Sequence, residues 1–214
     1  MIEAALFDMD GLLLDSENVY AEGLRAATGQ LSYVFTHEML METIGASQAA
    51  IDGCFLRANP TYKREDLQRA LGVWLRQNGY DRRMPLKPYA QEILQHLRAR
   101  GVKCALVTNT PRAIAEPYMR SAGLWLLLDA AVTGDLGLPG KPAPDAFLRA
   151  AELLGVDIRR CAVLEDSYNG LRAGRAAGAV TVMVPDLLPY GEKIAPYCDF
   201  AADTLREAEA FLCR

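Results

Sequence analysis

The sequence contains few of the residues that build histidine or cysteine metal centres. Its 214 residues include two histidines, His37 and His96, and five cysteines. Both histidines lie in helical patterns, and no C-x-x-C pair occurs, so a zinc site built on paired histidines is not expected. The cysteines are odd in number and scattered, and Cys104 and Cys161 fall inside apolar strand-like runs. We expect reduced, mostly structural thiols, which indicates the cytoplasm.

The sequence also lacks an excess of basic charge and any long apolar run. The formal net charge is −4, which excludes a general attraction to nucleic acid or anionic membranes. The longest apolar runs, such as residues 124–128, are too short to span a bilayer. The first residues show no basic segment followed by a small-residue cleavage site. We therefore expect no nucleic-acid or membrane partner, and any bound anion needs a local site. The sequence does not define the oligomeric state, and a monomer is expected.

An alternation of strand and helix patterns runs through most of the chain, in which 51% of residues are hydrophobic and 23% charged. Apolar runs of the kind found in parallel strands covered on both faces lie at 2–8, 102–108, 161–166, 179–184 and, more weakly, 130–134, and a last short one is expected near 198–202. Helical patterns followed by a glycine lie at 88–100, 111–122, 143–154 and 167–177, and a last one lies at 204–212. This alternation predicts an α/β fold with a Rossmann-like, doubly wound parallel sheet.

One block breaks the alternation. From Glu17 to about Tyr80 the sequence shows helical patterns only, at 17–28, 36–43, 47–58 and 63–78. The block follows the first strand directly, so we expect an α-helical cap domain inserted into the α/β core. The expected core domain comprises residues 1–15 and 84–214, and the expected cap domain comprises residues 16–83, with hinges near 14–16 and 83–87.

Acidic side chains stand at the ends of two expected strands. "FDMDG" places Asp8 and Asp10 after the first strand, and "LEDSYNG" places Glu165 and Asp166 after the fourth. Ligands of open α/β sheets bind at the carboxyl ends of strands. Each motif alone also fits a solvated turn or an acidic first turn of a helix. Gathered at one edge, however, these carboxylates would repel one another without a cation, and Mg²⁺ suits oxygen ligands beside a phosphate.

Residues suited to holding an anion follow two further strands. In "VTNT", Thr108 offers a hydroxyl, and Asn109 an amide and a backbone N–H at a helix N-terminus. In "GKPAPD", Lys141 stands in a stiff glycine–proline loop. The loop is not a P-loop, because Asp135 and Pro142 stand where that motif needs glycine and a hydroxyl residue. A plain helix cap and an exposed loop lysine are the alternatives for the single motifs.

With "FDMDG", "VTNT", "GKPAPD" and "LEDSYNG" in this order, the chain resembles the haloacid dehalogenase superfamily of phosphotransferases over essentially its whole length. The helical insert is similar to the cap of the superfamily's β-phosphoglucomutase-like branch. The resemblance implies that Asp8 is a nucleophile that forms an aspartyl phosphate, and that Asp10 is the acid/base. It implies that the residues that orient the phosphate are Thr108, Lys141 and, beside them, Asn109. The implied Mg²⁺ ligands are Asp8, the backbone carbonyl of Asp10, Asp166 and, directly or through water, Glu165.

Within the superfamily, the resemblance favours a phosphatase. Dehalogenases lack the second aspartate, Asp10. β-Phosphoglucomutases carry a histidine where we align Tyr20 and an arginine where this chain has Gln48, so a proton shuttle and a cation are missing. We expect an Mg²⁺-dependent phosphatase that hydrolyses a small phosphorylated metabolite. A sugar-phosphate mutase and a non-catalytic protein that binds a phosphorylated ligand remain the alternatives.

Residues of the expected cap near the first hinge and the "IGAS" loop are candidates for contacts to the leaving group. They are Glu17, Asn18, Tyr20, Gly45 and Ser47. Each also fits an ordinary helix-surface or loop residue. Small polar side chains at these positions suit a sugar or polyol phosphate, and the sequence does not define the natural substrate.

Overall fold

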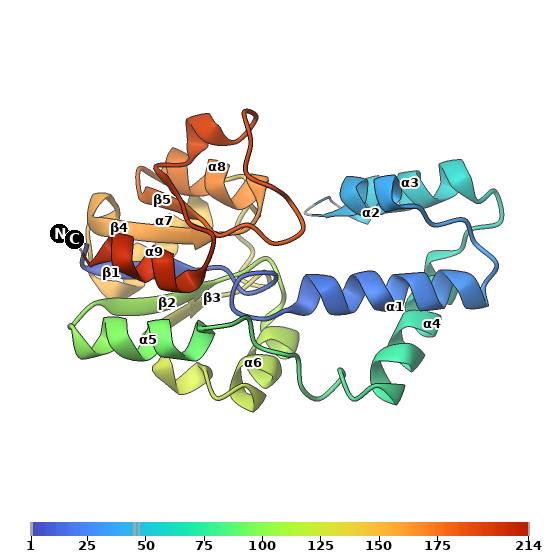
Figure 1. Ribbon diagram of the computed structural model, residues 1–214, viewed down its shortest axis with the longest axis horizontal. Helices are drawn as coiled ribbons and strands as arrows, with labels where there is room; N and C mark the ends of the chain where they lie inside the picture. Colours follow the sequence, from blue (N-terminus) through green and yellow to red (C-terminus); the bar gives the residue numbers. More distant parts are fainter. Residues whose placement is uncertain (1, 45, 47, 214) are drawn as a thin grey trace. The chain divides into compact units, whose positions relative to one another are not determined.

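The computed structural model describes residues 2–44, 46 and 48–213, and the chain divides into two compact units. The first unit comprises Met1–Asp15 and Pro85–Arg214, and the second comprises Ser16–Met84. The boundaries expected from the sequence differ from these by one residue, Met84. The chain leaves the first unit after Asp15 and returns at Pro85, so the second unit is an insertion (Figure 1).

The first unit is built on a parallel sheet, which in the described residues has six strands in the order β3-β2-β1-β4-β5-β6. The strands are β1 (Ala4–Phe7), β2 (Lys103–Val107), β3 (Ala130–Val132), β4 (Cys161–Glu165), β5 (Val180–Met183) and β6 (Phe200–Ala201). This sheet confirms the predicted α/β class. The chain adds β2 and β3 on one side of β1 and β4 to β6 on the other, so the strand order switches between β1 and β4. Such a switch point is where doubly wound sheets bind their ligands.

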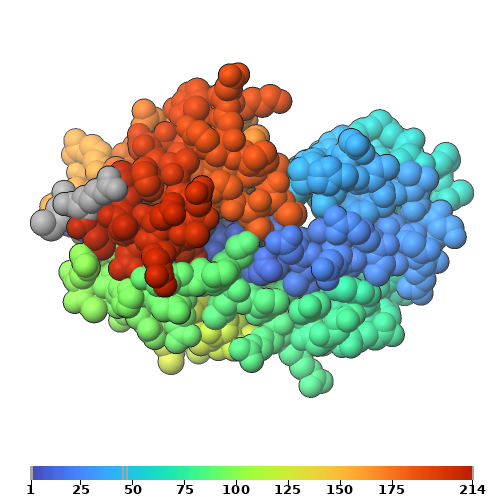
Figure 2. Space-filling model, in the orientation of Figure 1, coloured from blue at the N-terminus to red at the C-terminus, as the bar shows by residue number. Residues whose placement is uncertain are grey.

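Five helices of the described chain flank this sheet: α5 (Ala90–Ala99), α6 (Arg112–Ser121), α7 (Asp145–Leu154), α8 (Tyr168–Ala177) and α9 (Leu205–Leu212). Short 3₁₀ turns lie at Trp125–Leu127, Ile158–Arg160 and Ala195–Tyr197. Helices α7 and α8 end at Gly155 and Gly178, whose left-handed φ angles of 65° and 88° suit glycine. Helices α7 and α8 pack on one face of the sheet (Figure 1), and α5 and α9 lie side by side on the other (Figures 1 and 2).

Burial on both faces of the sheet explains why the strands read as continuous apolar runs. Ala4 and Leu6 of β1 face a cluster that includes Phe147 of α7. The alternate residues, Ala5 and Phe7, are equally buried, at 0% exposure. Since helices cover both faces of the sheet, a ligand can reach polar side chains of β1 and β4 only at the ends of these strands.

The second unit is helical, as expected, with α1 (Ser16–Gln30), α2 (His37–Thr43), α3 (Gln48–Ala58) and α4 (Arg64–Gln77). Helix α1 packs on α4, and α2 packs on α3. The α1–α4 contact is close at Gly23, where an added Cβ would lie 2.6 Å from Leu71 Cδ1. In the core of the unit, the Phe55 ring stacks on Phe35 at 5.7 Å and on Tyr62 at 5.2 Å. No helix in the described part of either unit is long and apolar enough to cross a membrane.

Candidate active site

Three carboxylates from two neighbouring strands meet at the switch point. Asp8 follows β1, Glu165 is the last residue of β4, and Asp166 comes next. One oxygen from each carboxylate lies within 4.8 Å of the other two, and all three side chains are buried. The structure therefore brings Asp8 close to Glu165 and Asp166, from which the sequence separates it widely.

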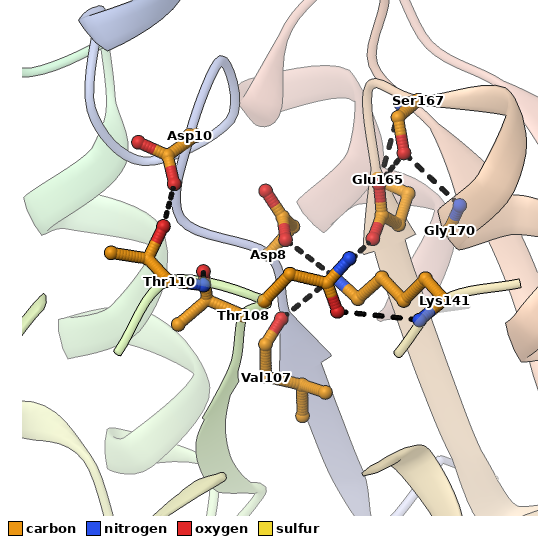
Figure 3. Close-up of polar contacts among 10 residues, drawn as sticks. Asp8, Asp10, Val107, Thr108, Thr110, Lys141, Glu165, Ser167 and Gly170 are labelled. Atoms are coloured by element: carbon orange, nitrogen blue, oxygen red, sulfur yellow. Dashed lines mark hydrogen bonds and ion pairs between the residues drawn. The ribbon is translucent and has the colours of Figure 1, made fainter. Parts of the chain in front are cut away.

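Lys141 places a buried cation against this cluster. Its Nζ donates hydrogen bonds to Asp8 Oδ1, to Glu165 Oε1 at 2.5 Å and to the Val107 carbonyl at 2.8 Å (Figure 3). The Lys141 side chain is only 4% exposed. Burial alone would lower the pKa of this amine, but the Asp8 and Glu165 carboxylates raise it above its usual value. Lys141 is therefore a fixed positive charge.

The cluster as a whole carries an excess of negative charge. Burial raises the pKa of Asp8 well above its ordinary value; Lys141 opposes the rise, and the Glu165 and Asp10 carboxylates add to it. Three carboxylates against one ammonium leave a charge that a divalent cation would offset. Because the donors are buried carboxylate oxygens close enough to share an ion, the set of Asp8, Glu165 and Asp166 fits Mg²⁺.

Glu165 is held at both of its oxygens. While Oε1 accepts from Lys141, Oε2 accepts from the Ser167 hydroxyl at 2.8 Å and from the Ser167 N–H at 3.3 Å. The same hydroxyl accepts from Gly170 N–H at 3.0 Å and so caps α8. A Cβ added to Gly170 would lie 1.8 Å from the Glu165 carboxyl carbon. Ser167 and Gly170 at the start of α8 thus fix the position of the Glu165 carboxylate, the first by hydrogen bonds and the second by leaving room for it.

We expect Gly170→Ala to displace the Glu165 carboxylate, because the new methyl group would occupy its position. Overpacking of this kind typically costs about 1–3 kcal/mol of folding free energy. The variant should melt at a lower temperature and bind divalent metal more weakly. Gly29→Ala is the matched control, since that helical glycine has nothing within 4 Å of an added Cβ. If Gly170→Ala kept wild-type stability and metal affinity, neither property would depend on this position of the Glu165 carboxylate.

Thr108 and Asn109 directly follow β2, and Thr108 lies beside the cluster (Figure 3). The buried Thr108 accepts the Thr110 N–H at its Oγ1, at 3.0 Å, so its hydroxyl hydrogen can donate to a phosphate oxygen. Asn109 Oδ1 accepts the backbone N–H of Lys141 at 3.2 Å. The Asn109 side chain therefore contacts the loop that carries Lys141, a contact that the sequence did not indicate.

Asp10 occupies the turn after β1, in which Gly11 has a φ of 77°. Its Oδ2 accepts a hydrogen bond from the Thr110 hydroxyl at 2.8 Å (Figure 3). Thr110 belongs to the "VTNT" motif, but sequence reasoning gave it no role. Asp15, the next acidic residue, pairs with Lys87 at 3.4 Å, and Lys87 also bonds Asp186 at 2.7 Å. Asp15 is not part of the carboxylate cluster.

The remaining candidates belong to the second unit. Glu17, Asn18 and Tyr20 lie in the first turns of α1 and are half-buried. Gly45 and Ser47 lie outside the described residues. The contacts to a leaving group that we expect of these five residues stay a prediction.

A doubly wound parallel sheet with a helical insertion, and a buried lysine among carboxylates at its switch point, defines an α/β protein with a charged ligand site at the strand ends. The sequence model of the haloacid dehalogenase-like hydrolase family matches residues 2–178 of this chain. The chain belongs to this family and is a hydrolase, as the resemblance of its motifs predicted.

Named relatives support this placement. A phosphorylated carbohydrates phosphatase from Thermotoga maritima is 28% identical over 83% of this chain and 82% of its own length. Hexitol phosphatase B from Escherichia coli K12 is 29% identical over 86% of this chain and 84% of its own. The crystal structure of a HAD family hydrolase from Deinococcus radiodurans R1, with bound phosphate and sodium, is 27% identical; its TM-score is 0.82 over 99% of this chain and 95% of that one.

Proposed function

We propose that this protein is an Mg²⁺-dependent phosphatase that hydrolyses the monoester of a small phosphorylated metabolite, such as a sugar or polyol phosphate. The observation that carries the proposal is the buried Asp8 carboxylate, which Lys141 orients and whose oxygen lies close enough to those of Glu165 and Asp166 to share a metal ion. Relatives named as phosphatases of phosphorylated carbohydrates and hexitols support the substrate class. Five free thiols suit a reducing compartment, and we propose the cytoplasm.

In the proposed first step, an oxygen of Asp8 attacks the phosphorus atom of the monoester. The P–O bond to the alcohol breaks, and an aspartyl phosphate forms. A carboxylate and a phosphate dianion repel each other, so the step requires neutralisation of charge. The Lys141 ammonium and the Thr108 hydroxyl supply part of it, and bound Mg²⁺ would supply the rest from Asp8, Glu165 and Asp166. Positioning and electrostatics of this kind carry most of phosphoryl-transfer catalysis.

Asp10 moves protons in both proposed steps. As the acid, it protonates the departing alcohol oxygen while the aspartyl phosphate forms. As the base, the resulting carboxylate takes a proton from the water that attacks phosphorus. The P–O bond to Asp8 breaks, inorganic phosphate leaves, Asp8 is returned as a free carboxylate, and Asp10 again carries its proton.

A screen of the purified protein against phosphorylated metabolites tests the proposal. Phosphate release from sugar or polyol phosphates supports it. Isomerisation of an aldose 1-phosphate with a bisphosphate primer would instead identify a mutase, against which Tyr20 and Gln48 argue. Binding of phosphate and Mg²⁺ without turnover of any compound would identify a non-catalytic binder.

Removal of divalent metal should abolish turnover, since the buried carboxylates would then repel an incoming phosphate dianion. We expect EDTA to reduce phosphate release by about 10²-fold or more, and Mg²⁺ in excess of the chelator to restore it. The thermal midpoint without substrate should also rise with Mg²⁺ concentration, because the ion binds only the folded cluster. Full activity after exhaustive chelation would contradict the metal requirement.

A further inference from the structure

We propose that Thr110 is a positioning residue for Asp10, fixing the carboxyl group that passes protons to and from substrate. The inference rests on the proposed function, because it assigns Asp10 the acid/base role. The carrying observation is the hydrogen bond of 2.8 Å from Thr110 Oγ1 to Asp10 Oδ2. In Figure 3 this pair stands beside the group formed by Asp8, Lys141 and Glu165.

A hydroxyl group is well suited to hydrogen-bond the Asp10 carboxyl group. Asp10 changes protonation state twice in each proposed catalytic cycle, as acid and then as base. A threonine hydroxyl has one donor hydrogen and two acceptor lone pairs, so it can donate to the carboxylate and accept from the carboxylic acid. An amide N–H or an ammonium group can only donate, so it could not accept a hydrogen bond from the O–H of the carboxylic acid. Thr110 can therefore keep Asp10 oriented in both states.

Thr110 is itself fixed by its backbone. Its N–H donates to Thr108 Oγ1 at 3.0 Å, and its carbonyl accepts from Gly134 N–H at 3.0 Å. The approach at Gly134 is close, since an added Cβ would lie 1.9 Å from the Asn109 carbonyl oxygen. The end of β2 is thereby tied to the loop that follows β3. Because both of its backbone polar groups are hydrogen-bonded, the backbone of Thr110 is held in place, and this fixes the position from which its hydroxyl donates to Asp10.

The backbone around Asp10 is fixed as well. Gly11 N–H donates to the Leu14 carbonyl at 2.9 Å, and the N–H groups of Leu13 and Leu14 both donate to the Met9 carbonyl at 3.0 Å. The turn therefore sets the position of the Asp10 Cα. The hydrogen bond from Thr110 restricts rotation of the side chain at the carboxyl group, where proton transfer takes place.

This role has a kinetic signature that a merely structural role lacks. An alkyl phosphate has a strongly basic leaving oxygen that needs protonation, whereas p-nitrophenol leaves readily as an anion. The value of kcat/KM reports the steps up to loss of the alcohol. Loss of acid positioning should therefore lower kcat/KM for an alkyl phosphate much more than for p-nitrophenyl phosphate. Damage to the phosphate site or to the fold would lower both.

The experiment compares the wild-type protein with Thr110→Val, which keeps the shape without the hydroxyl, and Thr110→Ser, which keeps the hydroxyl. For the best alkyl phosphate from the metabolite screen, Thr110→Val should lower kcat/KM by about 10- to 100-fold. For p-nitrophenyl phosphate we expect a loss of no more than about 3-fold. Thr110→Ser should recover most of the alkyl activity. Thermal midpoints of the three proteins, measured with Mg²⁺, check that all are folded.

The outcomes separate this inference from the function on which it rests. If the wild-type protein releases no phosphate from any compound, the proposed function fails, whatever the variants do. If the wild-type protein is active and Thr110→Val matches it on both substrates, or loses activity equally on both, Thr110 does not position the acid. Failure of Thr110→Ser to recover alkyl activity would likewise overturn the inference.

Discussion

Asp8→Asn should reduce the rate of phosphate release by about 10³-fold or more, because an amide cannot take the place of a carboxylate nucleophile. The substitution changes little else in the site. An amide oxygen can still accept the hydrogen bond from Lys141, and the side-chain volume is unchanged. The variant also removes one of three crowded negative charges, so the fold should be kept without metal. Rates under saturating substrate and Mg²⁺, with thermal midpoints, measure both effects.

Two further observations would sharpen the Asp8 test. Acid quenching of the wild-type enzyme during turnover should trap a phosphate group on the peptide that contains Asp8, which mass spectrometry would detect. Asp203→Asn, an exposed aspartate of the same unit, is the matched control and should keep wild-type activity. Substantial turnover by Asp8→Asn, or a phosphate group trapped elsewhere, would refute the nucleophile assignment.

The fold was predictable because buried strands and helix ends require particular residue types, which can be recognised in the sequence. β1 and β4 are covered on both faces, so Phe7 and Val163 stand in runs without polar interruption. Glycines such as Gly155 and Gly178 mark helix ends, where a left-handed residue is required. The last expected strand, the short one at 198–202, is the shortest strand of the described residues, at Phe200–Ala201. Its paired segment is too short for a clear pattern to form.

The site was predictable in part, for a geometric reason. Side chains that follow parallel strands meet at one edge of a sheet, so Asp8 and Asp166 could be placed near each other without coordinates. Hydrogen-bond partners are set instead by tertiary distances. "VTNT" does not show that Thr110 contacts Asp10, and the glycine of "LEDSYNG" does not show that Gly170 leaves room for Glu165. Ser167 could be expected as a helix cap, but not as a donor to Glu165.

Lys141→Met should have the second large effect, on both turnover and stability. Catalysis would lose the fixed cation beside the attacked phosphate, and we expect a fall of about 10²- to 10³-fold in kcat. Folding would lose the only cation shown against Asp8 and Glu165 among the described residues. Removing one partner of a buried ion pair typically costs about 3–5 kcal/mol. In EDTA the thermal midpoint of the variant should therefore lie well below that of the wild type.

Divalent metal separates the two consequences of Lys141→Met. Mg²⁺ should raise the thermal midpoint of the variant more than that of the wild type, because more uncompensated negative charge faces the ion. It should not restore kcat, since the ion cannot take the position of the ammonium group between Asp8 and Glu165. Lys193→Met, at an exposed lysine, is the control and should change neither quantity. A variant that matched the wild type in EDTA would show that Asp8 and Glu165 need no cation in the folded protein, and the electrostatic account of the site would fail.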